Sequence, residues 1–460
     1  MTARLFGTNG IREVVGEKLT AAFVTRVAGA IASTIPVGAP VVVGRDGRTS
    51  SFALSRIVSS TLAMGGHRAI EVGVLPTPAV QYLVPRLSAQ LAVIVTASHN
   101  PAEFNGLKCI AADGLEVSRS IEQAIEDATE KGTAASARYT DIGTITTVSD
   151  GGHRYVEGIL GQVDVARIRK RKLTVVLDCG NGASVETSPA LLRRLGCRVV
   201  TLNGHLDGTF PGHPSEPTEP NTRDAQRTVA AVDADFGVIH DGDADRAVFV
   251  DHTGRYVPGE ETLALLARDA VERAHGGVVV SPVSASQSLE DAIAPLGGSV
   301  FYTRIGSPAV THAMVDQHAV FGGEENGGII TPKFQYARDG AMTLASVLDL
   351  LARLERPLAD LLAELPHYAL VKERIPCPTE LRPQVVEWVG EKLQKEADRI
   401  VTIDGVKVFW DGGWMLLRPS GTEPLLRLFA EAKDPKRARE FADLGLAAVR
   451  EALAQAKGAG

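Results

Sequence analysis

Three aspartates lie within five residues of the sequence HDGDADRAVFVD: Asp241, Asp243 and Asp245. Apolar runs precede and follow them, so we expect the three carboxylates at the tip between two strands. Like charges this close repel one another, and a hard divalent cation such as Mg²⁺ would stabilise them. An EF-hand calcium loop needs glycine at its sixth position and glutamate at its twelfth, where this sequence has Arg246 and His252. The pattern predicts a magnesium site, and a solvated acidic turn is the alternative.

A serine beside a histidine follows the strand-like sequence LAVIV: Ser98 and His99. Such a serine is usually a cap or turn former, but the pair could also be a nucleophile beside a base. The hairpin signal Asn105-Gly106 precedes the sequence LKCIAA, which would run back beside LAVIV and bring Lys108 close to Ser98. No Gly-x-Ser-x-Gly elbow surrounds the serine. A serine with a lysine nearby and a separate metal loop therefore favours phosphoryl transfer over acyl transfer.

The sequence RPSGTEPLLR contains a second group of polar residues, between two apolar runs. Ser420, Gly421 and Thr422 offer backbone N–H and hydroxyl donors, and Arg418 and Arg427 flank them. Glycine lets a backbone approach an anion closely, and arginine can hold a phosphate with two hydrogen bonds. The segment predicts a phosphate-binding loop, although a hairpin with solvated arginines would have the same letters.

The sequence GGEENGG places Glu324, Glu325 and Asn326 among four glycines. Glycines permit unusual backbone angles, and the carboxylate and amide oxygens could accept hydrogen bonds from the hydroxyl groups of a polyol. The pattern indicates a sugar-recognition loop, and a flexible acidic loop is the alternative.

Three β-rich sequences open in a similar way: VVVGRDGR from Val41, TVVLDCGNG from Thr174 and VVVSPVSAS from Val278. Helical patterns follow each of them, which is typical of α/β units with largely parallel strands. A second strand ending in one of the polar loops comes about 50, 60 and 40 residues after the respective opening strand. We therefore predict three related mixed α/β domains, each contributing one loop to a site.

The pattern changes after residues 364–378. We expect a helix over roughly 382–398, strands separated by turns at Asp404-Gly405 and 411–413, and a final helix from Pro435, which together indicate a smaller antiparallel α+β domain. The stretch 376–383, which contains prolines, is interpreted as a linker. The predicted domains, with the loop that each carries, are 1–148 (serine), 149–251 (metal), 252–366 (sugar) and 367–460 (phosphate).

Composition is that of a water-soluble globular protein, with 44% hydrophobic and 22% charged residues and a net charge of −7. The negative charge argues against a nucleic-acid or membrane surface, so an anionic ligand must meet a local cluster of basic side chains. The N-terminal sequence has no signal peptide pattern and no apolar run approaches a membrane span, so we expect a cytoplasmic protein. The four cysteines form no Cys-x-x-Cys pair and are expected to be buried, reduced thiols: Cys109, Cys179, Cys197 and Cys377.

In this order, the loops resemble those of the α-D-phosphohexomutases. The resemblance rests on LFGTNGIRE, VVVGRDGR, TASHNP, NGLK, DGDADR, GGEENGG and RPSGTEP, and it covers nearly the whole chain. FGTNGIRE and GGEENGG look most like archaeal-type phosphoglucosamine mutases and phosphomannomutase/phosphoglucomutases. The family implies four domains around a central cleft, the first three α/β and the last smaller.

The resemblance also implies roles for individual residues. Ser98 matches the phosphorylated serine, the three aspartates match the ligands of one Mg²⁺ per chain, and an oxygen of the phosphoserine is a further ligand. Basic residues near the transferring phosphoryl group correspond to Arg12, Lys108 and Arg246. Sugar recognition corresponds to Glu324 and Asn326, and the grip on the phosphate that is not transferred corresponds to Arg418, Ser420, Gly421, Thr422 and Arg427.

The reaction so implied interconverts a hexose 6-phosphate and a hexose 1-phosphate. Ser98 gives its phosphoryl group to the sugar, a hexose 1,6-bisphosphate forms and reorients, and its other phosphate returns to the serine. Closure of the last domain would keep out water, which would otherwise hydrolyse the phosphoserine. The expected partner is a small sugar phosphate, with no nucleic acid and no membrane, and homo-oligomerisation is left open.

Two departures from the family pattern affect the interpretation. Many relatives have GEMSGH, where this chain has Asn326 and Gly328, so the general acid/base cannot be placed on Gly328; Lys108 or His99 could serve instead. The sequence TRIGSPAV also departs from the VGD pattern of phosphoglucosamine mutases. We favour glucosamine phosphate as substrate because Glu324 with Glu325 could attract an ammonium group, and mannose and glucose phosphates are the alternatives. A Mg²⁺-dependent phosphatase using Ser98 and a sugar-phosphate-binding regulator are the competing functions.

Overall fold

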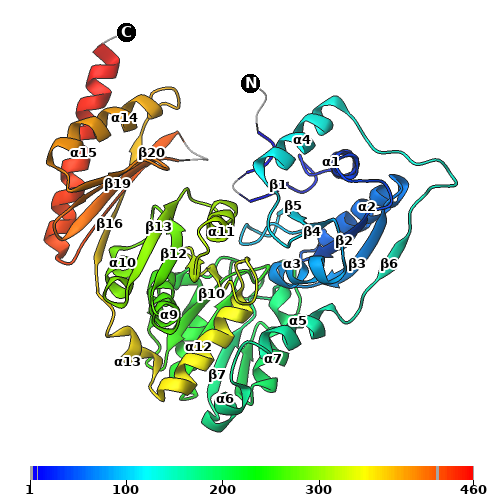
Figure 1. Cartoon of the computed structure of the whole chain (residues 1–460), viewed down its shortest axis with the longest axis horizontal. Coiled ribbons are helices and arrows are strands. Elements are labelled where there is room, and N and C mark those ends of the chain that lie inside the picture. Colours follow the sequence, from blue (N-terminus) through cyan, green and yellow to red (C-terminus); the bar gives the residue numbers. More distant parts are fainter. Residues whose placement is uncertain (1–3, 8, 421–423, 459–460) are drawn as a thin grey trace.

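A computed structural model of the chain describes residues 4–7, 9–420 and 424–458. The described residues fold around four β-sheets that follow one another along the sequence (Figure 1). The first three sheets combine parallel and antiparallel pairs, and the fourth is entirely antiparallel. The predicted fold class is therefore confirmed: three mixed α/β domains and a C-terminal antiparallel α+β domain.

The first sheet has the strand order β1-β5-β4-β2-β3-β6. Its strands are β1 (Ile11–Val14), β2 (Pro40–Arg45), β3 (Arg68–Val74), β4 (Leu91–Val95), β5 (Phe104–Ala111) and β6 (Ile145–Thr147), and its helices are α1 (Ala21–Ser33), α2 (Ser51–Met64), α3 (Thr77–Arg86) and α4 (Arg119–Lys131). All five residues of β4 are buried, which is the reason for its unbroken apolar sequence.

The second sheet has the order β11-β10-β9-β7-β8. Its strands are β7 (Thr174–Asp178), β8 (Arg198–Leu202), β9 (Phe236–His240), β10 (Ala247–Asp251) and β11 (Tyr256–Val257), accompanied by α5 (Gly151–Leu160), α6 (Val165–Arg171), α7 (Ser188–Arg194) and α8 (Arg223–Ala231) and by the 3-10 turns Ala183–Glu186 and Glu219–Thr222. The sequence predicts that the second domain ends at residue 251. The edge strand β11 lies beyond that residue but belongs to the second sheet, because Val257 pairs with Phe249 of β10. The exact domain boundaries remain predictions.

The third sheet has the order β13-β12-β14-β15. It contains β12 (Gly277–Pro282), β13 (Gly298–Thr303), β14 (Phe321–Gly323) and β15 (Ile329–Ile330), with α9 (Gly259–Ala274), α10 (Gln287–Ile293), α11 (Ser307–Asp316), α12 (Gly340–Leu354), α13 (Leu358–Leu362) and the 3-10 turn Ala294–Leu296. The fourth sheet has the order β16-β20-β19-β18-β17. It contains β16 (Ala369–Pro376), β17 (Arg399–Val401), β18 (Val406–Trp410), β19 (Gly413–Pro419) and β20 (Leu425–Ala432), with α14 (Arg382–Leu393), the 3-10 turn Gln394–Glu396 and α15 (Pro435–Gly458).

The first three sheets share one arrangement at the strand that carries a predicted site loop. In each, a parallel strand ends in the polar loop and the chain returns as its antiparallel neighbour: β4 to β5, β9 to β10 and β14 to β15. In the fourth sheet the RPSGTEP sequence joins the antiparallel pair β19 and β20. Each predicted loop therefore lies at one end of its sheet, where side chains can leave the core.

The predicted position of the hairpin turn, at Asn105-Gly106, is wrong, but the predicted pairing of the two strands is confirmed. Both residues lie inside β5, and the turn precedes that strand. A Cβ atom on Gly106 would lie 2.0 Å from the carbonyl oxygen of Ile11, so the glycine is needed for the close approach of β1. Antiparallel pairing of Ile94 with Lys108 brings the lysine back beside β4 as predicted.

The interpretation of residues 376–383 as a linker is also wrong. Pro376 ends β16, which pairs along eight residues with β20, and the N–H of Cys377 donates to the carbonyl oxygen of Pro424. The stretch therefore lies inside the fourth domain, and the connection between the third and fourth domains runs from α13 to β16.

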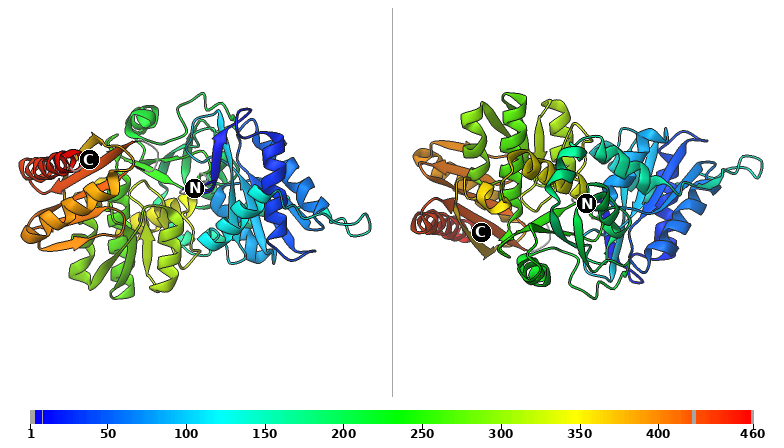
Figure 2. Two further views of the ribbon diagram at one scale, coloured as in Figure 1. Left: turned by 90° about the horizontal axis from the view of Figure 1, so that it is seen from above. Right: turned by 90° about the horizontal axis from the view of Figure 1, so that it is seen from below.

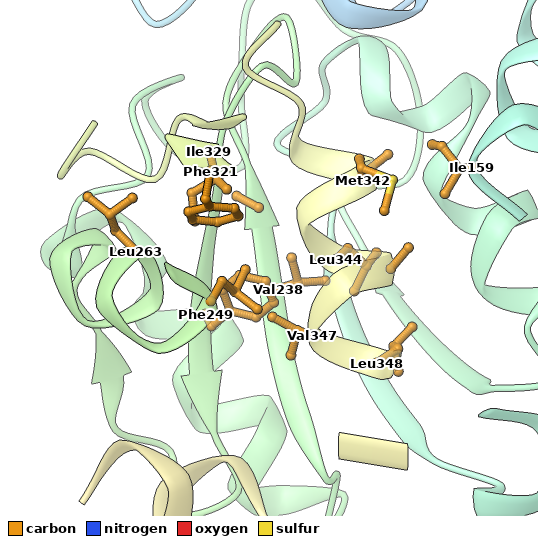
Figure 3. Packing of buried hydrophobic residues seen from close by; sticks show 14 of the residues in the cluster. Ile159, Val238, Phe249, Leu263, Phe321, Ile329, Met342, Leu344, Val347 and Leu348 are labelled. Atoms are coloured by element: carbon orange, nitrogen blue, oxygen red, sulfur yellow. The ribbon is translucent and has the colours of Figure 1, made fainter. Parts of the chain in front are cut away.

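A continuous apolar core passes through the second and third domains (Figure 3). Val238 and Phe249 on the second sheet pack with Leu263 of α9, Phe321 of β14 and Val347 of α12, and all five are buried. The same core includes Ile94 of the first domain and Trp414 of the fourth, so it connects all four domains that carry the loops. The first and fourth domains lie at opposite ends of the molecule in all three views (Figures 1 and 2). None of the described helices is both long and apolar enough to span a membrane.

Candidate active site

The loop after β4, residues 96–103 (the serine loop), holds Ser98 in an unusual backbone conformation. Ser98 has φ of 52° and is fully buried. The left-handed region costs a residue with a side chain about 1 kcal/mol or more, so surrounding bonds must hold it. The Ser98 N–H donates to Thr96 Oγ1 over 2.9 Å, and Ser215 Oγ from the second domain donates to the Ser98 carbonyl oxygen over 3.1 Å.

Arg48, from the VVVGRDGR sequence, stabilises the same loop through hydrogen bonds to its backbone. Its guanidinium donates to the carbonyl oxygens of Ser98 at 2.7 Å and Asn100 at 2.6 Å, and also to those of Pro101 and Phe104. Asp46 accepts from Arg48 Nε at 3.1 Å. The side chain is fully buried, so its charge and its donors are committed to the position of the serine loop.

The three aspartates of residues 241–246 (the aspartate loop) converge as the sequence predicts. Carboxylate oxygens of Asp241, Asp243 and Asp245 all lie within 4.8 Å of one another, and the three residues are buried. Ser98 Oγ donates to Asp241 Oδ2 over 3.0 Å, which joins the serine loop to the aspartate loop. Burial raises the pKa of Asp241 well above its usual range, and the charges of Asp245 and Asp243 raise it further.

The donor set fits a hard cation. Asp243 Oδ1 and Asp245 Oδ1 are buried without a hydrogen-bond partner in the part of the chain that the structure describes. Unpartnered buried carboxylate oxygens are costly, and a bound Mg²⁺ would satisfy both while reducing the repulsion among the three charges. The cluster is therefore compatible with a metal site.

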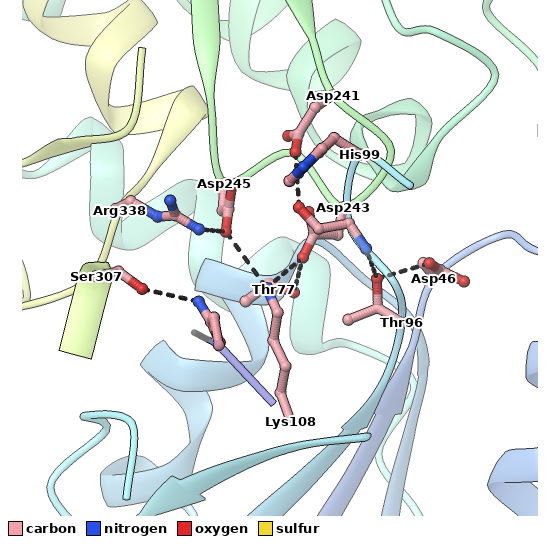
Figure 4. A network of polar contacts seen from close by, with 12 residues as sticks. Asp46, Thr77, Thr96, His99, Lys108, Asp241, Asp243, Asp245, Ser307 and Arg338 are labelled. Carbon is pink, nitrogen blue, oxygen red and sulfur yellow. Dashed lines mark hydrogen bonds and ion pairs between the residues drawn. The ribbon is translucent and has the colours of Figure 1, made fainter. Parts of the chain in front are cut away.

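Lys108 enters this cluster from β5 (Figure 4). Its Nζ lies 2.7 Å from Asp243 Oδ2 and 3.3 Å from Asp245 Oδ2. Thr77 Oγ1 also donates to Asp243 Oδ2, at 2.7 Å. Burial raises the pKa of Asp243, but the Lys108 ammonium outweighs it and the net pKa is lowered. The lysine and threonine occupy one oxygen of Asp243 and leave the other for a cation.

Arg246 and His99 form a pair beside the cluster. Arg246 Nη2 donates to His99 Nδ1 over 2.8 Å, so the ring accepts at this nitrogen. Burial, together with the neighbouring charges of Arg246 and Arg12, lowers the pKa of His99 to about 2. An imidazole that stays neutral and is engaged by an arginine is a poor proton carrier, which argues against His99 as the general acid/base.

Arg12 approaches the serine loop from β1. Its backbone pairs with Gly106 of β5, and its Nη1 donates to Asn100 Oδ1 over 2.9 Å. Burial lowers the pKa of Arg12, although Asp243 and Asp245 oppose this effect. The arginine therefore brings a positive charge to the edge of the aspartate loop, and its role near the phosphoryl group stays a prediction.

A cavity of about 710 Å³ adjoins the cluster and is lined by all four domains. Its wall includes six arginines: Arg4, Arg12, Arg246, Arg338, Arg418 and Arg427. Although the net charge of the chain is negative, positively charged side chains are concentrated around this cavity, which suits an anionic ligand. The predicted central cleft is present.

The glutamate loop, residues 322–328, divides its polar side chains between two directions. Glu324 and Asn326 line the cavity, and their role in sugar recognition stays a prediction. Glu325 does not line it, and its Oε1 accepts instead from Ser284 Oγ over 2.7 Å. The expectation that both glutamates would attract a sugar ammonium is therefore wrong for Glu325. Glu324 is itself paired, because its Oε2 accepts from Arg338 Nη1 over 2.5 Å.

Arg418 of β19 and Arg427 of β20, which flank the RPSGTEP loop, both line the cavity. Arg418 Nη2 donates to Asp404 Oδ2 over 3.2 Å. Ser420 is buried, and its carbonyl oxygen accepts from Arg382 Nη1 over 2.6 Å. The predicted residues Gly421 and Thr422 lie outside the described residues.

Comparison with known families decides the relationship. Sequence models of phosphoglucomutase/phosphomannomutase match the chain in four parts: alpha/beta/alpha domain I over 3–136, domain II over 153–254, domain III over 258–368 and the C-terminal domain over 374–445. The chain belongs to the phosphoglucomutase/phosphomannomutase family. It is a phosphohexomutase, an isomerase of the intramolecular phosphotransferase type.

Relatives of the phosphohexomutase extend over nearly its whole length. A phosphoglucomutase/phosphomannomutase of Thermococcus kodakarensis is 39% identical over 98% of this chain and 99% of the relative. A probable phosphoglucosamine mutase of Methanopyrus kandleri is 40% identical over 96% of each chain. Among solved structures, a phosphoglucomutase/phosphomannomutase family protein of Burkholderia thailandensis is 28% identical, with a TM-score of 0.88 and 98% of each chain covered.

Several residues of the phosphohexomutase site were not identified from the sequence. Arg48 and Thr77 hold the serine and aspartate loops, and Glu216 lies 3.6 Å from Arg246 at the cavity wall. Arg338 donates to Asp245 Oδ2 over 2.5 Å as well as to Glu324. VVVGRDGR carried a signal for Arg48, whereas nothing local to residue 338 indicated its contacts.

Proposed function

We propose that this phosphohexomutase transfers the phosphoryl group of a phosphorylated Ser98 to a hexose phosphate and takes it back from the hexose 1,6-bisphosphate so formed. One observation carries the proposal: Ser98 Oγ lies 3.0 Å from Asp241 Oδ2, in the cluster where one oxygen each of Asp243 and Asp245 has no hydrogen-bond partner among the described residues. A phosphoryl group on Ser98 would thus meet the metal-binding carboxylates directly. A Mg²⁺ ion bound there supplies positive charge to the phosphoryl oxygens.

The side chains of the protein then have separate tasks. In the forward half-reaction a sugar hydroxyl oxygen bonds to phosphorus, the bond from phosphorus to Ser98 Oγ breaks, and the hydroxyl proton leaves. Lys108 is the proposed proton carrier, since His99 is engaged by Arg246. Its ammonium gives a proton to Ser98 Oγ as the bond to phosphorus breaks, and the amine so formed takes the proton of the sugar hydroxyl. Arg12 and Arg246 line the cavity and neutralise charge on the moving group. The return half-reaction uses the same groups in reverse after the bisphosphate has reoriented.

The remote phosphate is assigned to Arg418 and Arg427, which line the cavity on the fourth domain. Ser420, Gly421 and Thr422 extend that assignment as donors of the same loop. The sugar ring is assigned to Glu324 and Asn326. Generic donors at the remote phosphate suit a substrate that must bind with either end toward Ser98.

Glucosamine phosphate is the first candidate substrate, since relatives from Methanopyrus kandleri and Methanothermobacter thermautotrophicus are named probable phosphoglucosamine mutases. One observation favours mannose and glucose phosphates as the second candidate: Glu325 turns to Ser284 and Glu324 pairs with Arg338, so these two glutamates do not together present their carboxylates to an ammonium. A comparison of kcat/KM on the three sugar 6-phosphates decides between them.

The proposal is tested with the Ser98→Ala variant in the presence of Mg²⁺ and a trace of hexose 1,6-bisphosphate. Isomerised sugar phosphate should fall at least about 1000-fold, and mass spectrometry of the wild type should find phosphate on Ser98. Stoichiometric release of inorganic phosphate by the wild type would instead identify a phosphatase, and unchanged turnover by the variant would refute the role of the serine.

A further inference from the structure

Gly328, where relatives with GEMSGH carry histidine, lies against the side chain of Arg338. A Cβ atom on Gly328 would be 2.4 Å from Arg338 Cδ and 3.3 Å from Arg338 Cγ. Non-bonded carbon atoms prefer separations of about 3.5–4.0 Å, so any side chain at position 328 would collide with the arginine. The space next to the glutamate loop is therefore already filled, from a segment ten residues further along the chain.

Arg338 is held at both ends of its guanidinium. Nη1 donates to Glu324 Oε2 and Nη2 to Asp245 Oδ2, each over 2.5 Å, and the side chain is only 6% exposed. Glu324 belongs to the glutamate loop and Asp245 to the aspartate loop. One planar cation thus joins the loop assigned to the sugar with the loop assigned to the metal, in the wall of the cavity. Its contact with Asp245 is drawn in Figure 4.

The arginine holds one oxygen of each carboxylate and leaves the other. Asp245 Oδ1 has no hydrogen-bond partner within the described residues, and Glu324 Oε1 accepts only a 3.2 Å bond from the Gly306 N–H there. A rigid fork that fixes both carboxylates determines where their second oxygens point. Lysine could not do this, because its single ammonium on a flexible stem does not present two parallel donors.

We propose that Arg338 is a positioning residue that occupies the place of the missing histidine. It orients Glu324 for the sugar hydroxyls and couples that orientation to Asp245 in the aspartate loop, and position 328 is glycine because the arginine needs the space. The inference rests on the proposed function of this site and adds to it a determinant of sugar binding.

The contact between Gly328 and Arg338 predicts a specific coupling between two substitutions. Gly328→Ala should raise KM for the hexose 6-phosphate at least about 10-fold in the native background, since the new methyl group displaces a clamped arginine. In the Arg338→Ala background the same change should alter KM by less than about twofold. Gly161→Ala, where a Cβ atom would have no neighbour closer than 3.4 Å, is the matched control and should leave KM unchanged.

A binding measurement separates positioning from folding. In a Ser98→Ala protein with Mg²⁺ present, titration calorimetry gives the affinities for glucosamine 6-phosphate and for inorganic phosphate. Arg338→Ala should weaken the sugar phosphate at least about 10-fold while inorganic phosphate changes less than about twofold, and Arg338→Lys should not restore the affinity. Arg255→Ala removes another arginine that bridges two carboxylates, Asp251 and Glu261, and serves as the control outside the cavity.

Three results would overturn the inference: an equal loss for both ligands, full restoration by lysine, or a Gly328→Ala effect that is the same in both backgrounds. Thermal melting of each variant shows whether it folds, and Gly328→Ala remains informative where Arg338→Ala does not fold. Turnover by Ser98→Ala would refute the proposed function alone, because the affinities are measured in a protein without that serine and the coupling needs only a KM, whichever group carries the phosphate.

Discussion

Lys108 Nζ lies 2.7 Å from Asp243 Oδ2, and this fully buried contact joins β5 of the first sheet to the aspartate loop of the second. The same ammonium lies 3.3 Å from Asp245 Oδ2. Two carboxylates therefore share one lysine, while their other oxygens have no hydrogen-bond partner among the described residues. Lys108 at the Oδ2 atoms and a cation at the Oδ1 atoms would together balance the negative charge of the carboxylates.

Replacing Lys108 with methionine should lower kcat at least about 100-fold, because the proposed proton carrier is lost. The same variant should unfold at a lower temperature without metal, since removing one partner of a buried ion pair costs about 3–5 kcal/mol. Mg²⁺ should raise its melting temperature more than that of the wild type. Lys131→Met, at the exposed end of α4, is the control and should keep the wild-type kcat. A kcat of Lys108→Met within threefold of the wild type would contradict the assignment of the proton carrier.

Replacing Asp241 with asparagine should have opposite effects on the free and metal-bound protein. Repulsion among three buried carboxylates falls, so the metal-free variant should melt at a higher temperature than the metal-free wild type. Stabilisation by Mg²⁺, about 2.7 kcal/mol at a concentration of 100 Kd for the wild type, should largely disappear, together with turnover. Melting curves with EDTA and with Mg²⁺ measure both effects. Equal stabilisation of the two proteins by Mg²⁺ would show that Asp241 is no ligand.

Residue type and strand pairing were sufficient to predict the centre of the site. Ser98 and the three aspartates follow apolar strands, and the strand after Ser98 returns antiparallel, which places Lys108 among them. The turn itself was mispredicted because Asn-Gly also suits a strand where another backbone approaches closely. The sequence alone does not distinguish a glycine in a hairpin turn from a glycine inside a strand that another backbone approaches closely.

Long-range partners were the part of the site that the sequence could not supply. Arg48 contacts a carbonyl 50 residues away, and Arg338 contacts a carboxylate 93 residues away. Neither pairing leaves a local periodicity. Glu324 and Glu325 show a related limit, because adjacent side chains at a strand end point to opposite sides and the sequence does not say which side is the cavity.

Replacing Arg48 with lysine should reduce kcat at least about 10-fold although the charge remains. Lysine cannot donate to the four carbonyl oxygens that Arg48 now serves, and each buried acceptor left without a donor costs about 1–3 kcal/mol. The serine loop should then lose its fixed conformation, which hydrogen exchange over residues 96–104 would detect. Arg45→Lys is the control, because this neighbour donates to the carbonyl of Asp46 at 3.3 Å and to no carbonyl of the serine loop among the described residues. Slow exchange in the Arg48 variant would contradict the supporting role.

Lys407 provides a prediction about pH and the docking of the fourth domain. It is fully buried, its Nζ donates to the Ala285 carbonyl oxygen of the third domain over 2.8 Å, and it lies 3.9 Å from the ring centroid of Trp414. Burial lowers its pKa to about 7, against the nearby carboxylates of Glu431 and Glu290, which raise it.

Because the lysine is protonated more readily in the unfolded chain than in the folded one, its contribution to the free energy of unfolding should increase as pH rises from about 7 toward 10. The increase is at most about 1.4 kcal/mol per pH unit. Lys407→Met removes this titration, so urea unfolding at pH 7, 8 and 9 should show the wild type gaining stability relative to the variant at each step. Lys433→Met, at an exposed lysine that pairs with Asp291, should keep the wild-type dependence. If the free energies of unfolding of wild type and Lys407→Met changed in parallel with pH, the pKa of the buried ammonium would be an ordinary one. The ring of Trp414 and the carboxylates of Glu431 and Glu290 would then offset the free energy that the ammonium loses when it is removed from water.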